Sequence, residues 1–239
     1  MKRLLVMILA VSTLAGCSQV GNGFKFHVRN GKVSWMNGTI GFRTDMASNG
    51  RRQDNLGFNA YIKDRDGRTI PMPGTDVLGY GASSPLGTSG LYKNKDGYSK
   101  AEVMMQTDDR MIIHLRHDTW ELFDTPVSFD KQITLFHDSP IMAVIDYYNG
   151  DFDLLNVAAG IKTEGMETLS ELEKGYAVTY RDNVTAIIIM PDLEEKRYNE
   201  ASGSVFVSKG ITADEPLRYY IGLSDRGTDY LLDKLSEIL

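Results

Sequence analysis

The sequence predicts an all-β protein, an antiparallel β-sandwich closed by a short C-terminal helix. Short runs in which apolar and polar residues alternate fill most of the chain beyond residue 24. These runs are rich in Val, Ile, Phe, Tyr and Thr, and Gly-containing turn signals separate several of them. Many short strands divided by such turns are typical of antiparallel sandwiches and barrels.

The strand-like runs begin close to the N-terminus. Period-two alternation first covers residues 24–28, 33–35 and 40–43. Later runs with the same character are residues 98–106, 110–117, 127–136, 141–148, 156–161, 176–181, 184–190, 204–209 and 217–223. The dipeptides Asp66-Gly67, Asp96-Gly97 and Asn149-Gly150 supply the positive φ angles that tight hairpin turns need, so we expect a turn at each.

Two segments have a helical character. The first, METLSELEKG from Met166, is short and polar, and Gly175 would end it. The second is the C-terminal TDYLLDKLSEIL, in which Thr228 is a candidate N-cap. Its apolar residues recur at roughly helical spacing and predict a stripe that packs on the sandwich: Tyr230, Leu231, Leu235 and Ile238.

Residues 70–97 depart from the strand pattern. Gly, Pro and Ser are frequent there, and the segment also contains Tyr80 and Tyr92. We expect a long connection. Such connections are disproportionately functional in compact domains, although a mobile surface loop is an equally good interpretation.

The N-terminus has the order of a secretory signal peptide: the cations Lys2 and Arg3, an apolar run too short to span a membrane, then small residues. Leu14-Ala15-Gly16-Cys17 has the form of a bacterial lipobox. We therefore expect residues 1–16 to be a lipoprotein signal peptide, residues 17–23 a lipidated tether and residues 24–239 a single β-sandwich domain. Ser18 after the cysteine favours the outer membrane of the bacterial cell envelope, with the lipid on Cys17 as the sole membrane contact.

Composition and motifs exclude several function classes. The formal net charge is −6, and removal of Lys2 and Arg3 makes it more negative, which argues against a nucleic-acid partner. Cys17 is the single cysteine, so no intramolecular disulfide and no cysteine metal cluster are expected. The acids of DYYNGDFD and KDRDG lack the glycine and distal glutamate of a calcium loop and are interpreted as turn residues. We expect neither a metal nor a cofactor.

The order of several motifs resembles the family called domain of unknown function 4861. These motifs run from Asp76 to Tyr92, from Trp120 to Leu135, from Val157 to Gly165 and from Pro216 to Asp225. The resemblance covers the chain from about Asp76 to the end. It implies a galactose-mutarotase-like or polysaccharide-lyase-like β-supersandwich, a carbohydrate ligand and a link with polysaccharide degradation.

The stretch HLRHDTW carries the main site hypothesis. If residues 111–120 form one uninterrupted strand, His114, Arg116 and Trp120 point to the same side. Trp120 would then stack on a pyranose, Arg116 would bind a carboxylate, and His114 would act as general acid or base. The alternative interpretation is a solvated strand face in which Arg116 pairs with an acid.

Further candidates complete three competing functions. The first is a carbohydrate-active lyase, isomerase or hydrolase acting on an oligosaccharide. If that oligosaccharide contains uronic acids, Arg116 or Arg43 would neutralise a carboxylate and Tyr92 would be the catalytic acid. Tyr80 and His137 are expected to contribute to substrate binding from the Gly-rich segment and a strand end. A glycan-binding lipoprotein without catalysis would use Trp120, Tyr80 and Tyr92 as stacking platforms. A structural envelope lipoprotein is the third possibility, with no motif in its favour.

Overall fold

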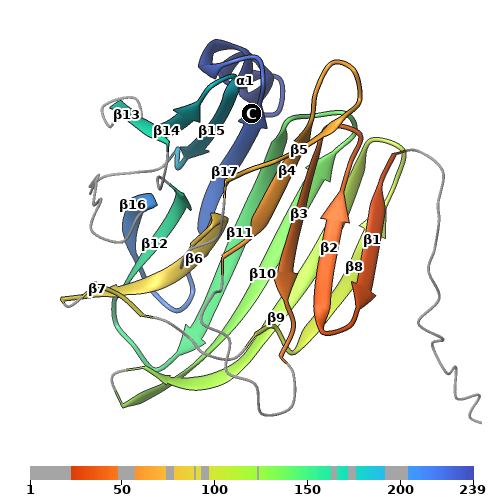
Figure 1. Cartoon of the computed structure of the whole chain (residues 1–239). Helices are drawn as coiled ribbons and strands as arrows, with labels where there is room; N and C mark the ends of the chain where they lie inside the picture. The colour runs from red at the N-terminus through yellow and green to blue at the C-terminus, as the bar shows by residue number, and fades with distance from the viewer. Residues whose placement is uncertain are drawn as a thin grey trace, which may run out of the picture.

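The computed structural model of the chain describes residues 23–47, 57–73, 78–88, 90–92, 97–122, 124–162, 166–171, 176–191 and 204–239. Within these residues the protein consists of three sheets and one helix, and the sheets form two layers (Figure 1). Every pairing between named strands is antiparallel. The predicted all-β antiparallel sandwich with a C-terminal helix is confirmed.

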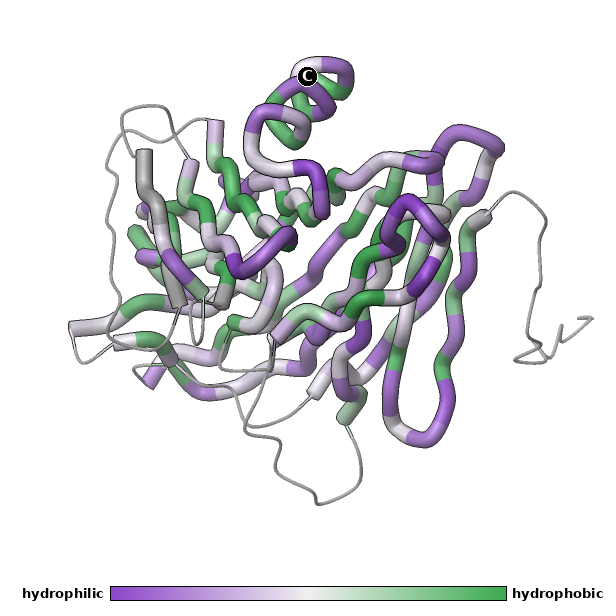
Figure 2. The backbone as a smooth tube through the Cα atoms, turned by 45° about the horizontal axis from the view of Figure 1, so that its top comes forward, coloured by the Kyte–Doolittle hydropathy of each residue, from purple (hydrophilic) through white to green (hydrophobic). Residues whose placement is uncertain are grey.

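One layer is a single eight-stranded sheet. Its three longest strands alternate between buried and more exposed residues, because one face of the sheet lies against the second layer. Figure 2 shows hydrophobic and hydrophilic residues following one another along the strands. In spatial order they are β13 (Glu167–Glu171), β14 (Tyr176–Arg181), β15 (Val184–Ile189), β17 (Leu217–Ser224), β11 (Ile141–Gly150), β10 (Thr125–Phe136), β9 (Arg110–Leu122) and β8 (Lys100–Gln106).

Two smaller sheets lie side by side in the second layer (Figure 1). The five-stranded sheet is β1 (Lys25–Arg29), β2 (Lys32–Met36), β3 (Ile40–Asp45), β4 (Asn59–Lys63) and β5 (Thr69–Pro71). The four-stranded sheet is β16 (Ser204–Ile211), β12 (Leu155–Lys162), β6 (Tyr80–Gly87) and β7 (Gly90–Leu91).

An isolated bridge between Phe58 and Gly79 joins the two small sheets where β4 and β6 begin. The Tyr80 amide donates a hydrogen bond to the Phe58 carbonyl at 2.9 Å. Gly79 has φ +53°, and a Cβ atom there would lie 2.5 Å from the Phe58 carbonyl oxygen. Only glycine fits this junction without a shift of the backbone.

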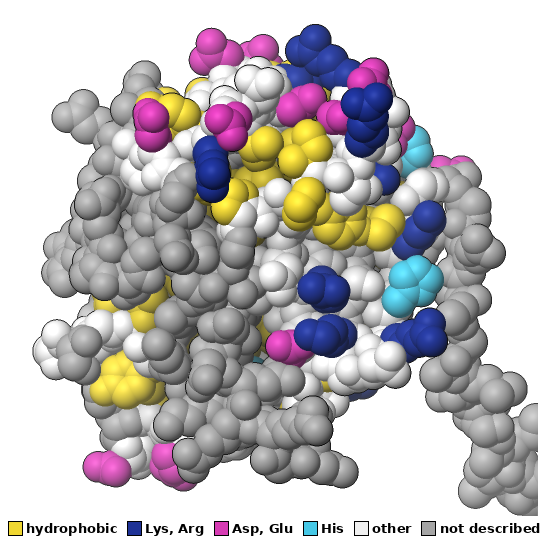
Figure 3. All heavy atoms as spheres, viewed as in Figure 1, with side chains coloured by type: hydrophobic (Ala, Val, Ile, Leu, Met, Phe, Trp, Pro, Cys, Tyr) yellow, Lys and Arg dark blue, Asp and Glu magenta, His cyan; other side chains and the backbone are white. Residues whose placement is uncertain are grey.

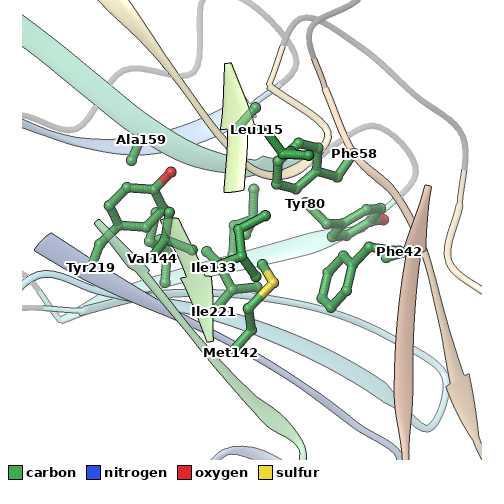
Figure 4. Packing of buried hydrophobic residues seen from close by; sticks show 14 of the residues in the cluster. Phe42, Phe58, Tyr80, Leu115, Ile133, Met142, Val144, Ala159, Tyr219 and Ile221 are labelled. Atoms are coloured by element: carbon green, nitrogen blue, oxygen red, sulfur yellow. The ribbon is translucent and has the colours of Figure 1, made fainter. Parts of the chain in front are cut away.

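The main hydrophobic core fills the space between the layers (Figure 4). Phe42 and Phe58 come from the five-stranded sheet and its entry, and Tyr80 from the four-stranded sheet. They pack against inward side chains of the large sheet such as Leu115 and Ile133, all with essentially no exposed area. The predicted strand alternation is what supplies these inward apolar rows.

Helix α1 (Thr228–Ser236) covers the outer face of the large sheet at β11, β15 and β17. Leu231 and Leu235 are buried there, as the apolar spacing predicts. The predicted cap is wrong: Gly227, with φ +84°, is the N-cap and Thr228 is the first helical residue. Among the described residues, no helix is long and apolar enough to cross a membrane.

Three further local predictions are wrong. The segment from Met166 is not a helix but leads into edge strand β13, since pairing with β14 outweighs its modest helix propensity. Asn149-Gly150 is no turn: both residues pair with β10 at the end of β11. The segment 70–97 contains β6, whose residues Tyr80 to Pro85 are all buried, so it is not one long connection.

The turn at Asp66-Gly67 is confirmed: Gly67 has φ +76°, and the Asp64 carboxylate accepts hydrogen bonds from the Asp66 and Arg68 amides. Asp96 lies outside the described residues.

Candidate functional site

A β-bulge divides strand β9, and it decides where the predicted site residues point. The register pairs Phe129 with His117 and Val127 with Trp120, so Asp118 and Thr119 lie opposite Ser128 alone. Before the bulge, His114 and Arg116 face outward while Leu115 and His117 are buried. The extra residue reverses the alternation beyond it.

Trp120 is therefore on the other side of the sheet from His114 and Arg116. Its ring packs against the main core and lies edge-on to the buried His117 ring, with 5.4 Å between centroids. The predicted common face of His114, Arg116 and Trp120 is wrong, because the strand is interrupted. Trp120 is half-buried and does not present a free ring face beside Arg116.

His114 lies between two carboxylates on the outer face of the large sheet. Its Nε2 is 2.7 Å from Asp130 Oδ1 on β10, and its Nδ1 is 3.3 Å from Glu102 Oε1 on β8. Because an ionised carboxylate only accepts, both contacts are hydrogen bonds only when both ring nitrogens carry protons. A hydrogen bond from Lys100, helped by His114, lowers the pKa of Glu102.

A polar row crosses the strands beside this cluster. Lys100, Arg116, Asp130 and Tyr147 are consecutive partners in the register of β8, β9, β10 and β11. Among the described residues, no carboxylate forms an ion pair with the exposed Arg116 guanidinium. The Tyr147 side chain is exposed, with 40% of its surface accessible. We call His114, Glu102, Asp130, Arg116 and Tyr147 the outer-face cluster.

Sequence reasoning identified His114 and Arg116 in this cluster but missed Glu102, Asp130 and Tyr147. The signal was present, because alternation along residues 127–136 and 141–148 places Asp130 and Tyr147 outward. What the sequence lacked was the strand pairing, which brings these three residues from separate strands to His114 and Arg116.

Tyr80 and Tyr92 do not overhang this cluster, contrary to expectation. Tyr80 is fully buried, and its hydroxyl donates to the Pro73 carbonyl at 3.0 Å. Tyr92 follows β7 and is half-buried against the core, and its carbonyl accepts a hydrogen bond from Ser84. Both belong to the second layer, on the opposite side of the large sheet from the outer-face cluster (Figure 1).

Arg43 and His137 lie elsewhere. Arg43 is exposed on the outer face of the five-stranded sheet, beside Tyr61, whose pKa burial raises to about 12 against the opposing charge of Arg43. His137 is in the turn between β10 and β11, with Nδ1 3.4 Å from Asp138 and its ring edge-on to Phe24. Cys17 lies outside the described residues. Within the described residues, no group of three His, Cys, Asp or Glu side chains is placed to hold a metal ion.

A second polar cluster is sealed between the layers, and the sequence did not reveal it. Lys131 Nζ lies 2.7 Å and 2.8 Å from the two carboxylate oxygens of Asp146 and 2.6 Å from Tyr219 Oη. Ser83 of β6 donates to Asp146 and is 2.9 Å from Tyr148 Oη. We call these five residues the buried network.

Burial governs the acid–base properties of the buried network. It lowers the pKa of Lys131, an effect that the Asp146 carboxylate opposes. It raises the pKa of Tyr148 and Tyr219 well above their usual range, and the negative charge of Asp146 acts in the same direction. Lys131 and Asp146 have no exposed area. The buried network therefore links the two layers and is not open to a ligand.

The comparisons with known proteins leave the class of the chain open. No protein-family model and no curated protein matches it. The chain has 10% identity to YidC from Thermotoga maritima, with a TM-score of 0.40, covering 88% of this chain and 53% of that one. It also has 10% identity to a human-microbiome protein described as a kojibiose phosphorylase, with a TM-score of 0.44, covering 91% of this chain and 36% of that one.

Proposed function

We propose that the protein is a lipid-anchored protein of the bacterial cell envelope that binds carbohydrate through the outer-face cluster. One observation carries this proposal: on the outer sheet face the exposed ring of Tyr147 lies in register with the Asp130 carboxylate and with the Arg116 guanidinium, which is unpaired among the described residues. The His114 imidazole contacts the same Asp130 carboxylate. The resemblance to the domain of unknown function 4861 family supports carbohydrate as the ligand class.

The chemistry of the cluster suits a sugar. Tyr147 offers an apolar ring face to the C–H groups of a pyranose, and its hydroxyl stays in water. The carboxylates of Asp130 and Glu102 accept hydrogen bonds from sugar hydroxyls, and His114 keeps Asp130 in position at 2.7 Å. Arg116 matches the carboxylate of a uronic acid, which it can bind with two parallel hydrogen bonds.

The contacts of His114 favour binding over catalysis. A general base needs a free nitrogen directed at the substrate, whereas both His114 nitrogens lie against carboxylates. Tyr92, the predicted acid, belongs to the other layer. Turnover by His114 and Arg116 stays a prediction, which the same experiment covers.

The test is a screen of the purified mature chain against neutral and uronic-acid polysaccharides, with binding measured by affinity electrophoresis and turnover by the absorbance of unsaturated sugars. Tyr147→Ala should weaken binding by at least about fivefold, since loss of an aromatic anchor commonly costs more than about 1 kcal/mol. Tyr180→Ala is the matched control, because Tyr180 is 39% exposed on β14 at the far end of the same sheet. The proposal would be contradicted if both variants lost the same glycan affinity, or if neither variant lost any.

Arg116 allows a sharper discrimination between ligands. Arg116→Gln should reduce binding of uronic-acid polysaccharides and leave neutral ones unchanged, because only the former offer a carboxylate. Arg110→Gln is the control, since Arg110 lies on the same strand and pairs with Asp109 at 3.0 Å. If the Arg116 variant also lost binding to neutral glycans, the substitution would have disturbed the structure of the site instead of removing a contact with a carboxylate.

A further inference from the structure

The outer face of the five-stranded sheet is cationic although the chain is acidic overall. Figure 3 shows Lys and Arg side chains gathered over β1–β3, with a histidine beside them. By strand alternation, six basic residues point outward here: Lys25, His27, Arg29, Lys32, Arg43 and Lys63. We call these six residues the cationic face. Asp45 is the acidic residue on the same strands. It contrasts with a formal net charge of −6 for the whole chain.

Most of this positive charge is not neutralised within the protein. Lys32 pairs with Asp45 at 2.8 Å, and Lys63 donates to the Thr69 hydroxyl at 2.7 Å. In the part of the chain that the structure describes, Lys25, Arg29 and Arg43 have no carboxylate within ion-pair distance. The cationic face thus offers several adjacent cations to an anionic partner.

The position of β1 in the sequence favours a membrane as that partner. Lys25 follows Cys17 by eight residues. Because an extended chain spans at most about 3.6 Å per residue, a lipid on Cys17 keeps Lys25 within about 29 Å of the bilayer. Basic residues held next to a bilayer are attracted by anionic headgroups, each increasing affinity roughly fivefold.

A glycan is the less suitable partner, because the described residues of the five-stranded sheet offer no free aromatic ring on the cationic face. The ring of Tyr61 lies over Gly41: a Cβ at Gly41 would be 2.0 Å from Tyr61 Cζ. The Tyr61 ring therefore packs against the backbone of β3, whereas Tyr147 on the other layer is exposed.

We infer that the cationic face docks on anionic phospholipid headgroups, as a second membrane contact beside the lipid that the sequence predicts as the sole one. The inference rests on the proposed lipid anchor at Cys17, which holds the cationic face near the bilayer. Docking would also set the orientation of the proposed carbohydrate site. Because the cationic face and the outer-face cluster lie on opposite sides of the sandwich, docking turns the outer-face cluster away from the bilayer and toward soluble or wall-bound carbohydrate.

The experiment uses the processed chain reconstituted into vesicles of phosphatidylcholine alone or of phosphatidylcholine mixed with phosphatidylglycerol. Mass spectrometry follows acetylation of Lys25 and Lys32, with Lys234 on α1 as an internal reference. We expect acetylation of Lys25 and Lys32 to be at least about fivefold slower with phosphatidylglycerol, and high salt to remove the difference. Equal rates in the two kinds of vesicle would overturn the inference.

Paired variants test which cations matter. Arg29→Gln with Arg43→Gln should weaken docking by about 25-fold, from roughly fivefold per residue, and return Lys25 to its rate in phosphatidylcholine. Arg110→Gln with Arg181→Gln removes two exposed arginines from hairpin ends elsewhere and should change nothing. Equal effects of the two double variants would exclude a specific face.

The outcomes separate this inference from the anchor. If the mass of Cys17 shows no lipid, the anchor fails, and sedimentation of the same chain with phosphatidylglycerol vesicles then tests the cationic face directly. Absence of co-sedimentation overturns the inference. Protection of Lys25 and Lys32 by soluble polygalacturonate but not by vesicles also overturns it, because the partner is then an anionic glycan.

Discussion

Lys131 and Asp146 are a charged pair without exposed area, directly opposite each other on β10 and β11. Removing two charges from water is expensive, so such a pair adds little net stability compared with apolar residues of similar size. It does make the interior intolerant of losing one partner. Tyr219 and Ser83 complete the hydrogen bonding, and Ser83 does so from the opposite layer.

Asp146→Asn should therefore lower the free energy of unfolding by about 3–5 kcal/mol, because it leaves the Lys131 charge buried and unpaired. Urea denaturation measures this. Asp109→Asn, which breaks an exposed pair with Arg110, should leave the free energy of unfolding nearly unchanged, because solvent screens the pair. The double variant Lys131→Met with Asp146→Leu should recover most of the loss. Similar costs for Asp146→Asn and Asp109→Asn would show that the pair is not buried in solution.

Trp120 packs against the core, so we expect its truncation to lower the stability of the fold. Trp120→Ala should cost about 2 kcal/mol, roughly half the loss for a fully buried aromatic residue, because the ring is half-buried against His117 and the core. Thermal unfolding measures the loss, and glycan affinity should be unchanged at temperatures where the variant is folded. A variant of unchanged stability that binds glycan less well would restore Trp120 to the binding site.

Two local backbone irregularities have consequences for whole elements. The bulge in β9 separates outward His114 and Arg116 from inward Trp120. The bridge at Gly79 joins β4 to β6 and so makes the two small sheets one layer. The bulge thus decides which face of the protein receives a side chain, and the bridge decides which sheets are neighbours.

Gly79→Ala should lower the free energy of unfolding by more than about 2 kcal/mol. The new Cβ would approach the Phe58 backbone to 2.5 Å, and the alanine would have to hold φ +53°. Gly67→Ala isolates the second effect, because Gly67 has φ +76° and nothing within 4 Å of its ideal Cβ position. It should cost only about 1 kcal/mol. Chemical denaturation compares the two, and equal losses would mean that the close approach to Phe58 is relieved easily.

At the scale of the whole molecule, the sandwich separates two polar surfaces. The cationic face lies on the outside of the five-stranded sheet, and the outer-face cluster lies on the outside of the eight-stranded sheet. The buried network and the core connect the layers between them. If the proposed anchor and the proposed docking both hold, the cationic face meets the bilayer and the outer-face cluster faces solvent.

The proposed anchor has its own test in cells. Cys17→Ala should remove fatty-acid labelling and leave the chain soluble or unprocessed, because the proposed lipid needs that sulfur for its attachment. Gln19→Ala, two residues further on, should keep the label and the membrane location. Metabolic labelling with a fatty acid, followed by fractionation, measures both. An unlabelled wild-type chain would exclude the anchor.

The sequence by itself determined the class of fold and most of the strands, but not β4, β5, β6 and β7. Period-two alternation reflects which side of a strand meets the core, and this local pattern predicted β1 to β3 and, apart from β13, the strands from residue 98 to 223. Helical spacing likewise predicted the packing of Leu231 and Leu235. It failed where pairing outweighed local preference, as in β13, which looks helical, and at Asn149-Gly150, which looks like a turn.

Only the tertiary structure decided which polar residues meet. The bulge opposite Ser128 follows from the register between β9 and β10, and one extra residue was enough to move Trp120 to the other face. The buried network joins β10, β11 and β17 to β6, and the outer-face cluster joins four neighbouring strands. Such contacts depend on which strands pair and which layers pack, and the alternation within one strand carries no information about either.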